Sequence, residues 1–388
     1  MNTIRSRLSD AWSRIRIPRS VIISVCVLPA VLMILFYALR SSTVVMGWVD
    51  TSIAVPVRSF LGLLSSIYPF SMMEVLCTVA GVWLIYYLVK SGMAISRRRS
   101  KLKILGKRLL PVLVAALYIW SLFCWLWNSG YHAPGFAEKN GLAGDGVALE
   151  DLIKVTRHFA RKANELAPQV DRDEDGRYIE DRIEMFAASP DIFRNVMREF
   201  PGLEGRVYRP KAMMFSWLMS RTGYTGIYFA LTGESNININ APGYLMPATV
   251  AHEQAHQLGV FAEDEANFVG IVACVTSRNV VFEYAGYMLG LSYLLNALFS
   301  EDFHVWAEIM DSLSEDVLRD RLENFEFWAA QRTVNTGINI LDNVLTAVTE
   351  TVSDAVDTIY DGYLRSQNQE LGIRSYGACV DLLVRYFS

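Results

Sequence analysis

Two histidines and a glutamate lie close together in the segment His252-Glu253-Gln254-Ala255-His256. Residues four apart share one face of a helix, so both imidazoles can bind a single zinc ion. Glu253 follows the first histidine and can accept a proton from a water molecule that attacks a carbonyl group. The segment therefore predicts zinc-dependent hydrolysis, with His252 and His256 as metal ligands and Glu253 as general base.

The motif could also be accidental, in a helix that carries two surface histidines. The whole chain has only five histidines, which makes this spacing around a glutamate an infrequent coincidence. The segment follows a strand-like stretch and precedes Gly259, a residue type that commonly ends a helix. An acidic cluster at 263–265 comes next. These neighbours favour a metal site over an accident.

A catalytic zinc needs a third protein ligand and an open position. In the gluzincin class of metallopeptidases this ligand is a glutamate in the pattern ExxxD. Glu263 and Asn267 resemble that pattern, with asparagine in place of aspartate. Asn267 can still hydrogen-bond a ligand histidine, although it carries no charge. We expect Glu263 to be the third ligand and keep Glu265 as the alternative.

Tyr376 is the candidate for a further catalytic task, which is to stabilise the negatively charged oxygen of the tetrahedral intermediate. It lies in the segment Arg374-Ser375-Tyr376-Gly377. Either the tyrosine hydroxyl or the Arg374 guanidinium could reach that oxygen. The alternative is that Tyr376 packs in the protein with its hydroxyl bonded locally.

A strand and several helices must position these residues. Residues 225–240 combine β-branched and aromatic residues with a central Thr-Gly turn, so we expect one or two short strands there. Apolar residues at helical spacing predict helices over 147–166 and 190–199. Nearly everything from Thr249 onwards also has a helical pattern. The folded part is therefore predicted to be mainly α with a small sheet.

The first third of the chain contains three apolar runs with the length of a membrane-spanning helix, about 21–39, 71–89 and 109–127. The first run shows no small-residue cleavage pattern, so we expect it to be retained. Basic residues precede it and fill the connection 90–108, which contains no acid. Because basic connections stay in the cytoplasm, the N-terminus is expected on the cytoplasmic side of the plasma membrane. Everything after the third run then lies outside.

The chain is thus expected to divide into a membrane domain, 1–129, and an extracytoplasmic domain, 130–388. Residues 52–67 are apolar but short, and could lie in the outer interface or touch the folded domain. The formal net charge of −4 argues against a nucleic-acid partner, which would require a basic face. The expected partners are a peptide or protein substrate and the lipid bilayer, and nothing in the pattern indicates an oligomeric state.

Other polar groups have ordinary structural explanations. Glu74, near the start of the second run, could serve a function inside the membrane or reach the headgroups. Cys274 and Cys379 could form a disulfide, although two buried free thiols are the commoner outcome. The acidic stretch 171–176 resembles the start of a calcium-binding loop. Arg182 stands where the bidentate glutamate of such a loop should be, which favours a solvated turn.

Several stretches of the chain resemble one known family. They are 228–238 (YFALTGESNIN), 246–247 (MP), 252–259 (HEQAHQLG), 263–268 (EDEANF) and 372–383 (GIRSYGACVDLL). The chain resembles the bacterial membrane family known as domain of unknown function 3810 (DUF3810), from the spans to the tail. This resemblance implies N-terminal membrane helices followed by a zincin-like domain. In zincins generally, a strand before the HExxH helix lines the cleft and pairs with an extended peptide.

Together these patterns predict three transmembrane helices, a zincin-like α+β domain with a small sheet, and a zinc-dependent metallopeptidase that acts on the outer face of the membrane. The first alternative is a non-catalytic sensor or scaffold that binds zinc and holds a peptide or partner protein. The second is a structural membrane protein in which the motif has no role. An intact Glu253 favours the enzyme, since a site that only binds has no need of a base.

Overall fold

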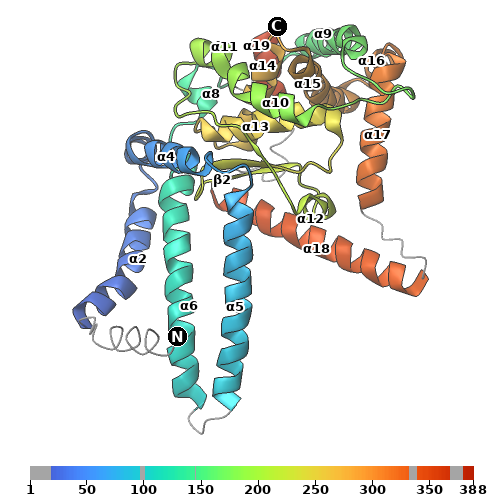
Figure 1. Cartoon of the computed structure of the whole chain (residues 1–388). Coiled ribbons are helices and arrows are strands. Elements are labelled where there is room, and N and C mark those ends of the chain that lie inside the picture. Colours follow the sequence, from blue (N-terminus) through green and yellow to red (C-terminus); the bar gives the residue numbers. More distant parts are fainter. Residues whose placement is uncertain (1–18, 97–100, 145, 332–338, 368–378) are drawn as a thin grey trace.

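The computed structural model describes residues 19–96, 101–144, 146–331, 339–367 and 379–388. Figure 1 shows a stem of long helices below a larger folded part, with one small sheet between them. Helices make up most of the described residues, and the sheet has three short strands. The predicted class, mainly α with a small sheet, is confirmed.

The stem contains three long helices. They are α2 (Arg19–Leu39), α5 (Met72–Ser96) and α6 (Lys101–Phe123). α5 and α6 run side by side in opposite directions (Figure 1). α2 packs against α6, where the Tyr118 hydroxyl donates to the carbonyl of Val25 at 2.9 Å and the Trp125 indole to that of Leu32 at 3.0 Å. A π-helical turn, Cys124–Asn128, carries α6 directly into α7 (Ser129–Tyr131).

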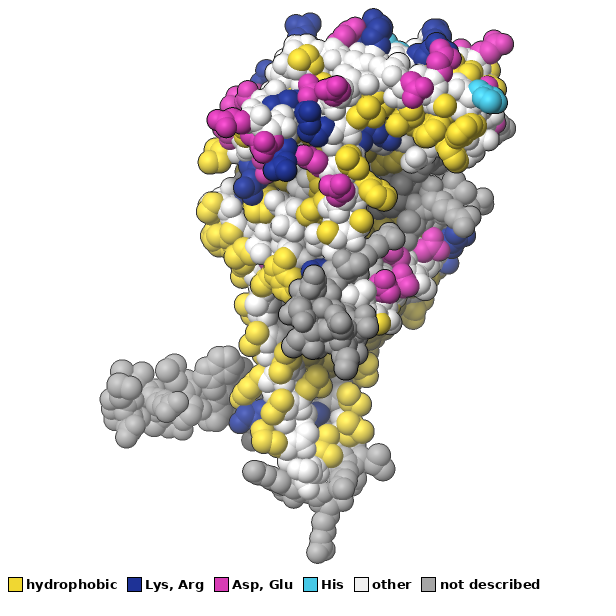
Figure 2. Space-filling view, turned by 90° about the vertical axis from the view of Figure 1, so that its right-hand side faces the viewer, with side chains coloured by type: hydrophobic (Ala, Val, Ile, Leu, Met, Phe, Trp, Pro, Cys, Tyr) yellow, Lys and Arg dark blue, Asp and Glu magenta, His cyan; other side chains and the backbone are white. Residues whose placement is uncertain are grey.

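The surface of the stem is apolar. Val79, Val82 and Ile85 of α5 all leave more than 60% of their surface exposed. Figure 2 shows hydrophobic side chains over the stem, whereas Lys, Arg, Asp and Glu gather on the upper part of the folded region. Exposed apolar bands of this size fit lipid rather than water. The protein is therefore a membrane protein by the composition of these helices.

Among the described residues, three helices are long and apolar enough to cross a membrane: Thr43–Ser65, Met72–Ser96 and Leu105–Tyr131. The last two contain the predicted spans at 71–89 and 109–127. The predicted span at 21–39 is helical, but its apolar part among the described residues, Ser24–Leu39, is shorter. As predicted, three helices are candidates for membrane spans. Two of them correspond to predicted spans, and the third is Thr43–Ser65 instead of 21–39.

The additional candidate, Thr43–Ser65, consists of α3 (Thr43–Val49), a π-helical segment (Asp50–Ala54) and α4 (Val55–Ser65). One third of it, 33%, is buried inside the protein, against 11% for each of the other two. Figure 1 shows α4 lying across the upper end of the stem, against the folded part. Contact with the folded part is one of the two positions that the sequence suggested for the apolar stretch 52–67.

The sheet has the strand order β1-β3-β2. β2 (Gly226–Phe229) and β3 (Glu234–Ile237) form an antiparallel hairpin, in which Phe229 pairs with Glu234. Gly233 has φ +67° and closes the turn, a conformation that glycine adopts without strain. This hairpin confirms the predicted strands at 225–240. β1 (Lys211–Ala212) pairs in parallel with β3, and its two residues were too few to give a pattern.

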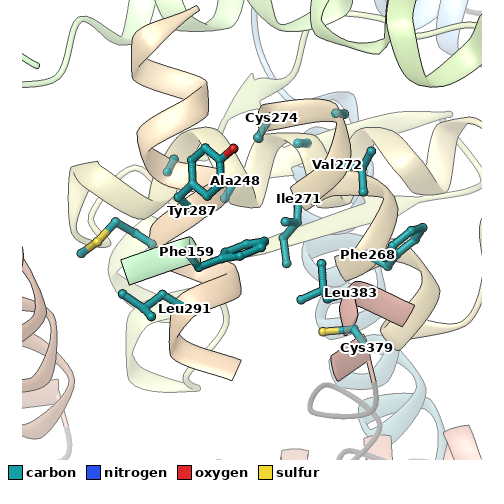
Figure 3. Packing of buried hydrophobic residues seen from close by; sticks show 14 of the residues in the cluster. Phe159, Ala248, Phe268, Ile271, Val272, Cys274, Tyr287, Leu291, Cys379 and Leu383 are labelled. Carbon is teal, nitrogen blue, oxygen red and sulfur yellow. The ribbon is translucent and has the colours of Figure 1, made fainter. Parts of the chain in front are cut away.

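The main core is helical. Its helices are α9 (Leu149–Leu166), α11 (Phe193–Glu199), α13 (Met246–Gln257), α14 (Glu263–Val275), α15 (Val280–Glu301) and α19 (Cys379–Phe387). Figure 3 shows Phe159, Phe268 and Leu291 meeting in this core. Cys274 and Cys379 are both buried there as free thiols. The predicted helices at 147–166 and 190–199 correspond to α9 and to the 3₁₀ turn Ser189–Ile192 with α11.

Shorter and outer elements complete the folded part. They are α8 (Phe136–Lys139), α10 (Arg182–Ala188), α12 (Ser216–Arg221), α16 (Phe303–Asp311), α17 (Glu315–Gln331) and α18 (Asn339–Ser366), with 3₁₀ turns at Ala167–Gln169 and Gly243–Leu245. Figure 1 shows α18 running along the underside of the folded part. It approaches the sheet and α13 from below.

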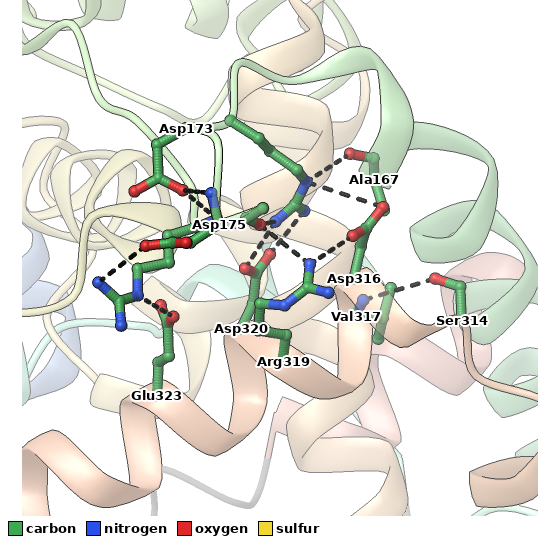
Figure 4. Close-up of polar contacts among 12 residues, drawn as sticks. Ala167, Asp173, Asp175, Ser314, Asp316, Val317, Arg319, Asp320 and Glu323 are labelled. Carbon is green, nitrogen blue, oxygen red and sulfur yellow. Dashed lines mark hydrogen bonds and ion pairs between the residues drawn. The ribbon is translucent and has the colours of Figure 1, made fainter.

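The acidic stretch at 171–176 forms a turn that is tied to α17 (Figure 4). Asp173 accepts hydrogen bonds from the backbone N–H groups of Asp175 and Arg177, at 3.0 and 2.8 Å. Arg172 donates to both carboxylate oxygens of the fully buried Asp320 at 2.9 Å. The stretch therefore fastens this loop to the core through Arg172.

Candidate metal centre

The HExxH segment lies on α13, a helix that is buried along most of its length. It ends at Leu258, and Gly259 follows with φ +81°, which turns the chain back after one residue. Ala262 then precedes the first turn of α14. Gly270 lets the two helices approach closely, since a Cβ there would lie 2.9 Å from the backbone nitrogen of His252. The short connection and this glycine bring Glu263 opposite the two histidines.

Buried amide side chains fix α13 against the sheet. Gln257 accepts a hydrogen bond from the Tyr208 backbone N–H at 2.7 Å and donates to the Ser235 hydroxyl at 2.8 Å. The Ser235 hydroxyl in turn donates to the carbonyl of Glu253 at 2.8 Å. One turn earlier in α13, Gln254 donates to the Ser189 hydroxyl at 2.7 Å. These hydrogen bonds between buried side chains hold the helix in one position against the sheet.

The ring nitrogens of both histidines point at one carboxylate. His252 Nε2 lies 3.1 Å from Glu263 Oε2, and His256 Nε2 lies 3.8 Å from the same atom. The three atoms that could bind a metal all lie within 4.8 Å of one another. The imidazole rings are nearly perpendicular, with centroids 4.8 Å apart. All three side chains are largely buried, so that little water competes for them.

The other nitrogen of each histidine faces an oxygen atom. His252 Nδ1 lies 3.0 Å from Asn267 Oδ1, and His256 Nδ1 lies 2.6 Å from the carbonyl oxygen of Val260. A carbonyl oxygen only accepts, so each Nδ1 carries a proton and each Nε2 is the nitrogen that faces Glu263. Two such nitrogens and one carboxylate oxygen form the donor set of a catalytic zinc site. The residues present therefore fit a zinc ion.

Burial and mutual contact set the charges of this cluster. Burial lowers the pKa of His256 to about 4, which leaves its imidazole neutral and able to bind a metal. Burial alone would raise the pKa of Glu263. The hydrogen bonds with His252 and Tyr360 and the electrostatic attraction of both histidines together outweigh burial, and they lower that pKa to about 2. Glu263 is therefore a carboxylate at neutral pH.

Glu253 lies beneath the first residue of β2. A Cβ at Gly226 would be 2.7 Å from its Oε1, so that only glycine lets the strand pass this close to the carboxylate. The backbone N–H of Tyr228 also donates to it. Burial raises the pKa of Glu253 to about 8, and the negative charge of Glu263 adds to this shift.

The alternative third ligand, Glu265, is not part of this cluster. Its carboxylate accepts hydrogen bonds from the backbone N–H groups of Phe136 and Ala137, at 2.9 and 2.8 Å, at the start of α8. Two residues along a helix differ in direction by about 200°, so Glu263 and Glu265 cannot both face the histidines. The carboxylate that the structure brings to the histidines is that of Glu263.

Tyr376 and Arg374 lie outside the described residues. A different tyrosine, Tyr360 on α18, donates its hydroxyl to Glu263 Oε1 at 2.6 Å. The sequence carried a partial signal, because Tyr360, Tyr363 and Leu364 share one face of an amphipathic helix. The spacing does not indicate which helix this face contacts, so the sequence does not identify Tyr360 as a residue of the site.

A second cluster of buried rings supports the site from the side of the stem. It consists of Trp127, Tyr131, Tyr228, Ala230, Phe261 and Leu364. The Trp127 ring meets the His256 ring edge to face, with centroids 5.4 Å apart. The Tyr363 hydroxyl donates to Asn128 Oδ1 at 2.7 Å. The π-helical turn that follows α6 thus forms one wall of the candidate metal centre.

A cleft of about 540 Å³ opens beside the cluster. His252, Glu253 and Tyr360 line it on the side of the metal centre. Its lining also includes Tyr293 of α15 and Trp328 of α17. Its volume is that of a site for a small molecule or a short peptide segment.

The arrangement combines a metal-binding set, a buried carboxylate that can act as a base and a cleft that reaches both. Comparisons of the chain with curated proteins and with solved structures found no match. A family model described as "Protein of unknown function (DUF3810)" matches residues 51–384, which include the stem helices α5 and α6 and the metal centre. The chain belongs to this DUF3810 family.

Proposed function

We propose that this protein is a membrane-anchored, zinc-dependent metallopeptidase. The observation that carries the proposal is the convergence of His252 Nε2, His256 Nε2 and a Glu263 oxygen within 4.8 Å, beside the cleft that Glu253 lines. A site that only binds zinc for structure is usually closed by four protein ligands. Here the described residues supply three, which is the number found in catalytic sites.

The chain's own residues supply the remaining steps. Glu253 accepts the proton of the attacking water and returns it to the leaving amine. Glycine at 226 allows the substrate-side strand to lie directly over that carboxylate. The hydrogen bond from Tyr360 holds Glu263 in place. A zinc ion bound by His252, His256 and Glu263 would supply the Lewis acid that polarises the scissile carbonyl.

Among the strands of the described residues, β2 pairs with β3 alone, which makes it an edge strand of the sheet. An edge strand offers free backbone N–H and C=O groups to an extended chain. Thr225 and Gly226, at its start, line the cleft next to Glu253. This geometry favours a polypeptide substrate over a small molecule, because the strand can hold the backbone while the cleft accepts side chains.

The orientation of the protein is part of the proposal. The connection between α5 and α6 and the N-terminal segment are rich in Lys and Arg. We place both in the cytoplasm by the positive-inside rule. α5 and α6 then carry the metal centre to the outer face of the plasma membrane, where exported peptides and membrane-protein ectodomains are the substrates.

The test uses the full chain in detergent or lipid nanodiscs. We expect one equivalent of zinc and hydrolysis of peptides from a broad library. Glu253→Gln should retain zinc and lose turnover, while His256→Ala should lose both. His304→Ala removes an exposed histidine outside the cluster and should change neither.

Two results would overturn the proposal in different ways. Stoichiometric zinc without turnover by the parent protein would indicate a sensor or scaffold that holds a peptide. A parent protein without zinc would indicate that the cluster is a buried ion pair between histidine and glutamate.

A further inference from the structure

A set of large apolar side chains is exposed where the folded part meets the stem. We call this set the apolar rim, and it consists of Ile67, Phe70, Met214, Phe215, Trp217 and Leu218. Each leaves between 40% and 71% of its surface exposed. Soluble surfaces seldom expose so many large apolar side chains together, and tryptophan in particular favours the boundary between lipid and water.

Helix α12, which carries Trp217 and Leu218 of the rim, is polar on its inner face and apolar on its outer face. The Ser216 hydroxyl donates inward to the carbonyl of Met213 at 2.8 Å and accepts from the backbone N–H of Ile239 at 3.0 Å. Ser220 bonds inward to the amide of Asn238, while Trp217 points outward. A helix at a water-facing surface has the opposite pattern. The surroundings of α12 are therefore apolar.

Hydrogen bonds hold the apolar rim at the level of the first turn of α5. The Glu74 carboxylate, in the first turn of that helix, accepts the backbone N–H groups of Met214 and Phe215, both at 2.8 Å. Glu234 of β3 accepts those of Met72 and Met73, at 3.1 and 3.0 Å. Figure 1 shows α12 on the underside of the folded part, near the upper end of α5. The rim thus lies level with the first turn of a candidate membrane span.

We propose that the apolar rim inserts into the interface of the same bilayer that α5 crosses, so that the cleft opens at the membrane surface. The cleft begins where α12 ends, because Ser220 to Gly226 form part of its lining. The position of the cleft at the membrane surface indicates the substrate class. This inference rests on the proposed peptidase activity. The substrate is a polypeptide segment held at the bilayer surface, such as the membrane-proximal part of another membrane protein.

Lipid contact can be measured without any activity. A spin label is attached to Trp217→Cys or Leu218→Cys in the full chain, with Cys26 and Cys77 replaced by alanine, in lipid nanodiscs. Ile183→Cys is the matched control, an exposed apolar position (87% exposed) on α10, in the upper part of the folded region (Figure 1). Labels at 217 and 218 should relax more strongly with oxygen than with a water-soluble nickel chelate, and the label at 183 should behave in the opposite way.

Other outcomes contradict the lipid contact. Equal access of the nickel chelate to positions 217 and 183 would place the rim in water. Labels at 217 that neither reagent reaches, with spectra broadened by a neighbouring label, would indicate that a second copy of the chain covers the rim.

The substrate class has its own test, which compares one cleavable sequence presented in two ways. The sequence is offered as a free peptide and as the segment that follows a membrane-spanning helix in the same nanodisc. Trp217→Glu should leave cleavage of the free peptide unchanged. Cleavage of the tethered sequence should fall on the order of tenfold, the scale of an effective-concentration advantage that is lost. Trp217→Phe, which keeps the side chain apolar, should match the parent.

The two proposals fail in distinguishable ways. If the parent cleaves neither form, the peptidase proposal fails, while the spin-label result still decides the lipid contact. If Trp217→Glu reduces cleavage of both forms equally, the rim has only a structural role. Zinc content and the unfolding temperature of each variant show whether it has folded.

Discussion

At the scale of single residues, the metal centre is held together by side chains from segments far apart in the chain. The sequence alone indicates His252, Glu253 and His256, because one helical turn joins them. Glu263 follows from a known ligand pattern, and its choice over Glu265 needs the direction of α14. Tyr360 is nearly one hundred residues further on and reaches Glu263 only through the path of α18. The spacing of residues along the chain does not show where α18 runs.

The role of Tyr360 leads to a prediction on zinc affinity. Tyr360→Phe removes the hydroxyl that bonds Glu263 and leaves the ring in place. Loss of a hydrogen bond to a ligand typically weakens metal binding about 10- to 100-fold. We expect a shift of this size in competition with a zinc chelator. Tyr386→Phe is the matched control, since that hydroxyl bonds Glu199 outside the site at 2.8 Å. Equal zinc affinity of the two variants would show that Tyr360 does not support Glu263.

At the scale of secondary-structure elements, two close approaches decide whether the site is formed. α14 packs on α13 through Gly270, and β2 passes over Glu253 through Gly226. The lengths of α9, α13 and the β2–β3 hairpin follow from periodicity and turn residues, which are local properties. The sequence pattern did not reveal the third strand, β1, and for the stretch 52–67 it left open whether the helix lies in the membrane interface or against the folded part. Both depend on partners far along the chain, Ile237 for the strand and the folded part for the helix.

The approach of β2 to α13 can be tested with a single methyl group. Gly226→Ala would place a Cβ 2.7 Å from Glu253 Oε1, so the carboxylate has to move. We expect zinc content to remain and kcat to fall, because the added methyl group meets the Glu253 side chain and none of the metal-binding atoms. Gly362→Ala on α18 adds the same methyl group where no atom lies within 4 Å, and activity should not change. A variant with full activity would mean that Glu253 has room to move without loss of function.

At the scale of the whole molecule, Arg58 forms a buried polar junction between the stem and the folded part. Arg58 of α4 pairs with Asp50 at 3.3 Å and donates to the carbonyl of Leu126 at 2.6 Å. Its guanidinium also lies over the Phe261 ring, 4.8 Å from the centroid. Arg58 is 1% exposed, so its charge depends entirely on these partners. The stem and the metal centre are therefore expected to unfold together.

Removal of this junction should be costly. Arg58→Ala leaves Asp50 buried without its partner, and breaking such a pair typically costs about 3–5 kcal/mol. Arg157→Ala breaks an exposed pair with Glu308 and should cost less than about 1 kcal/mol. Thermal unfolding of the two variants in the same detergent measures the difference. Equal unfolding temperatures would contradict a structural role of the junction.

Trp127 belongs both to the π-helical turn that follows α6 and to the wall behind His256. A cut just after the stem would therefore release a fragment that lacks this indole, together with Arg58 and Asn128. Such a fragment would expose His256, Tyr228 and Phe261, which now pack against it. Cleavage between stem and folded part, a common way to free a membrane-anchored domain, would in this protein destroy the site instead of liberating it.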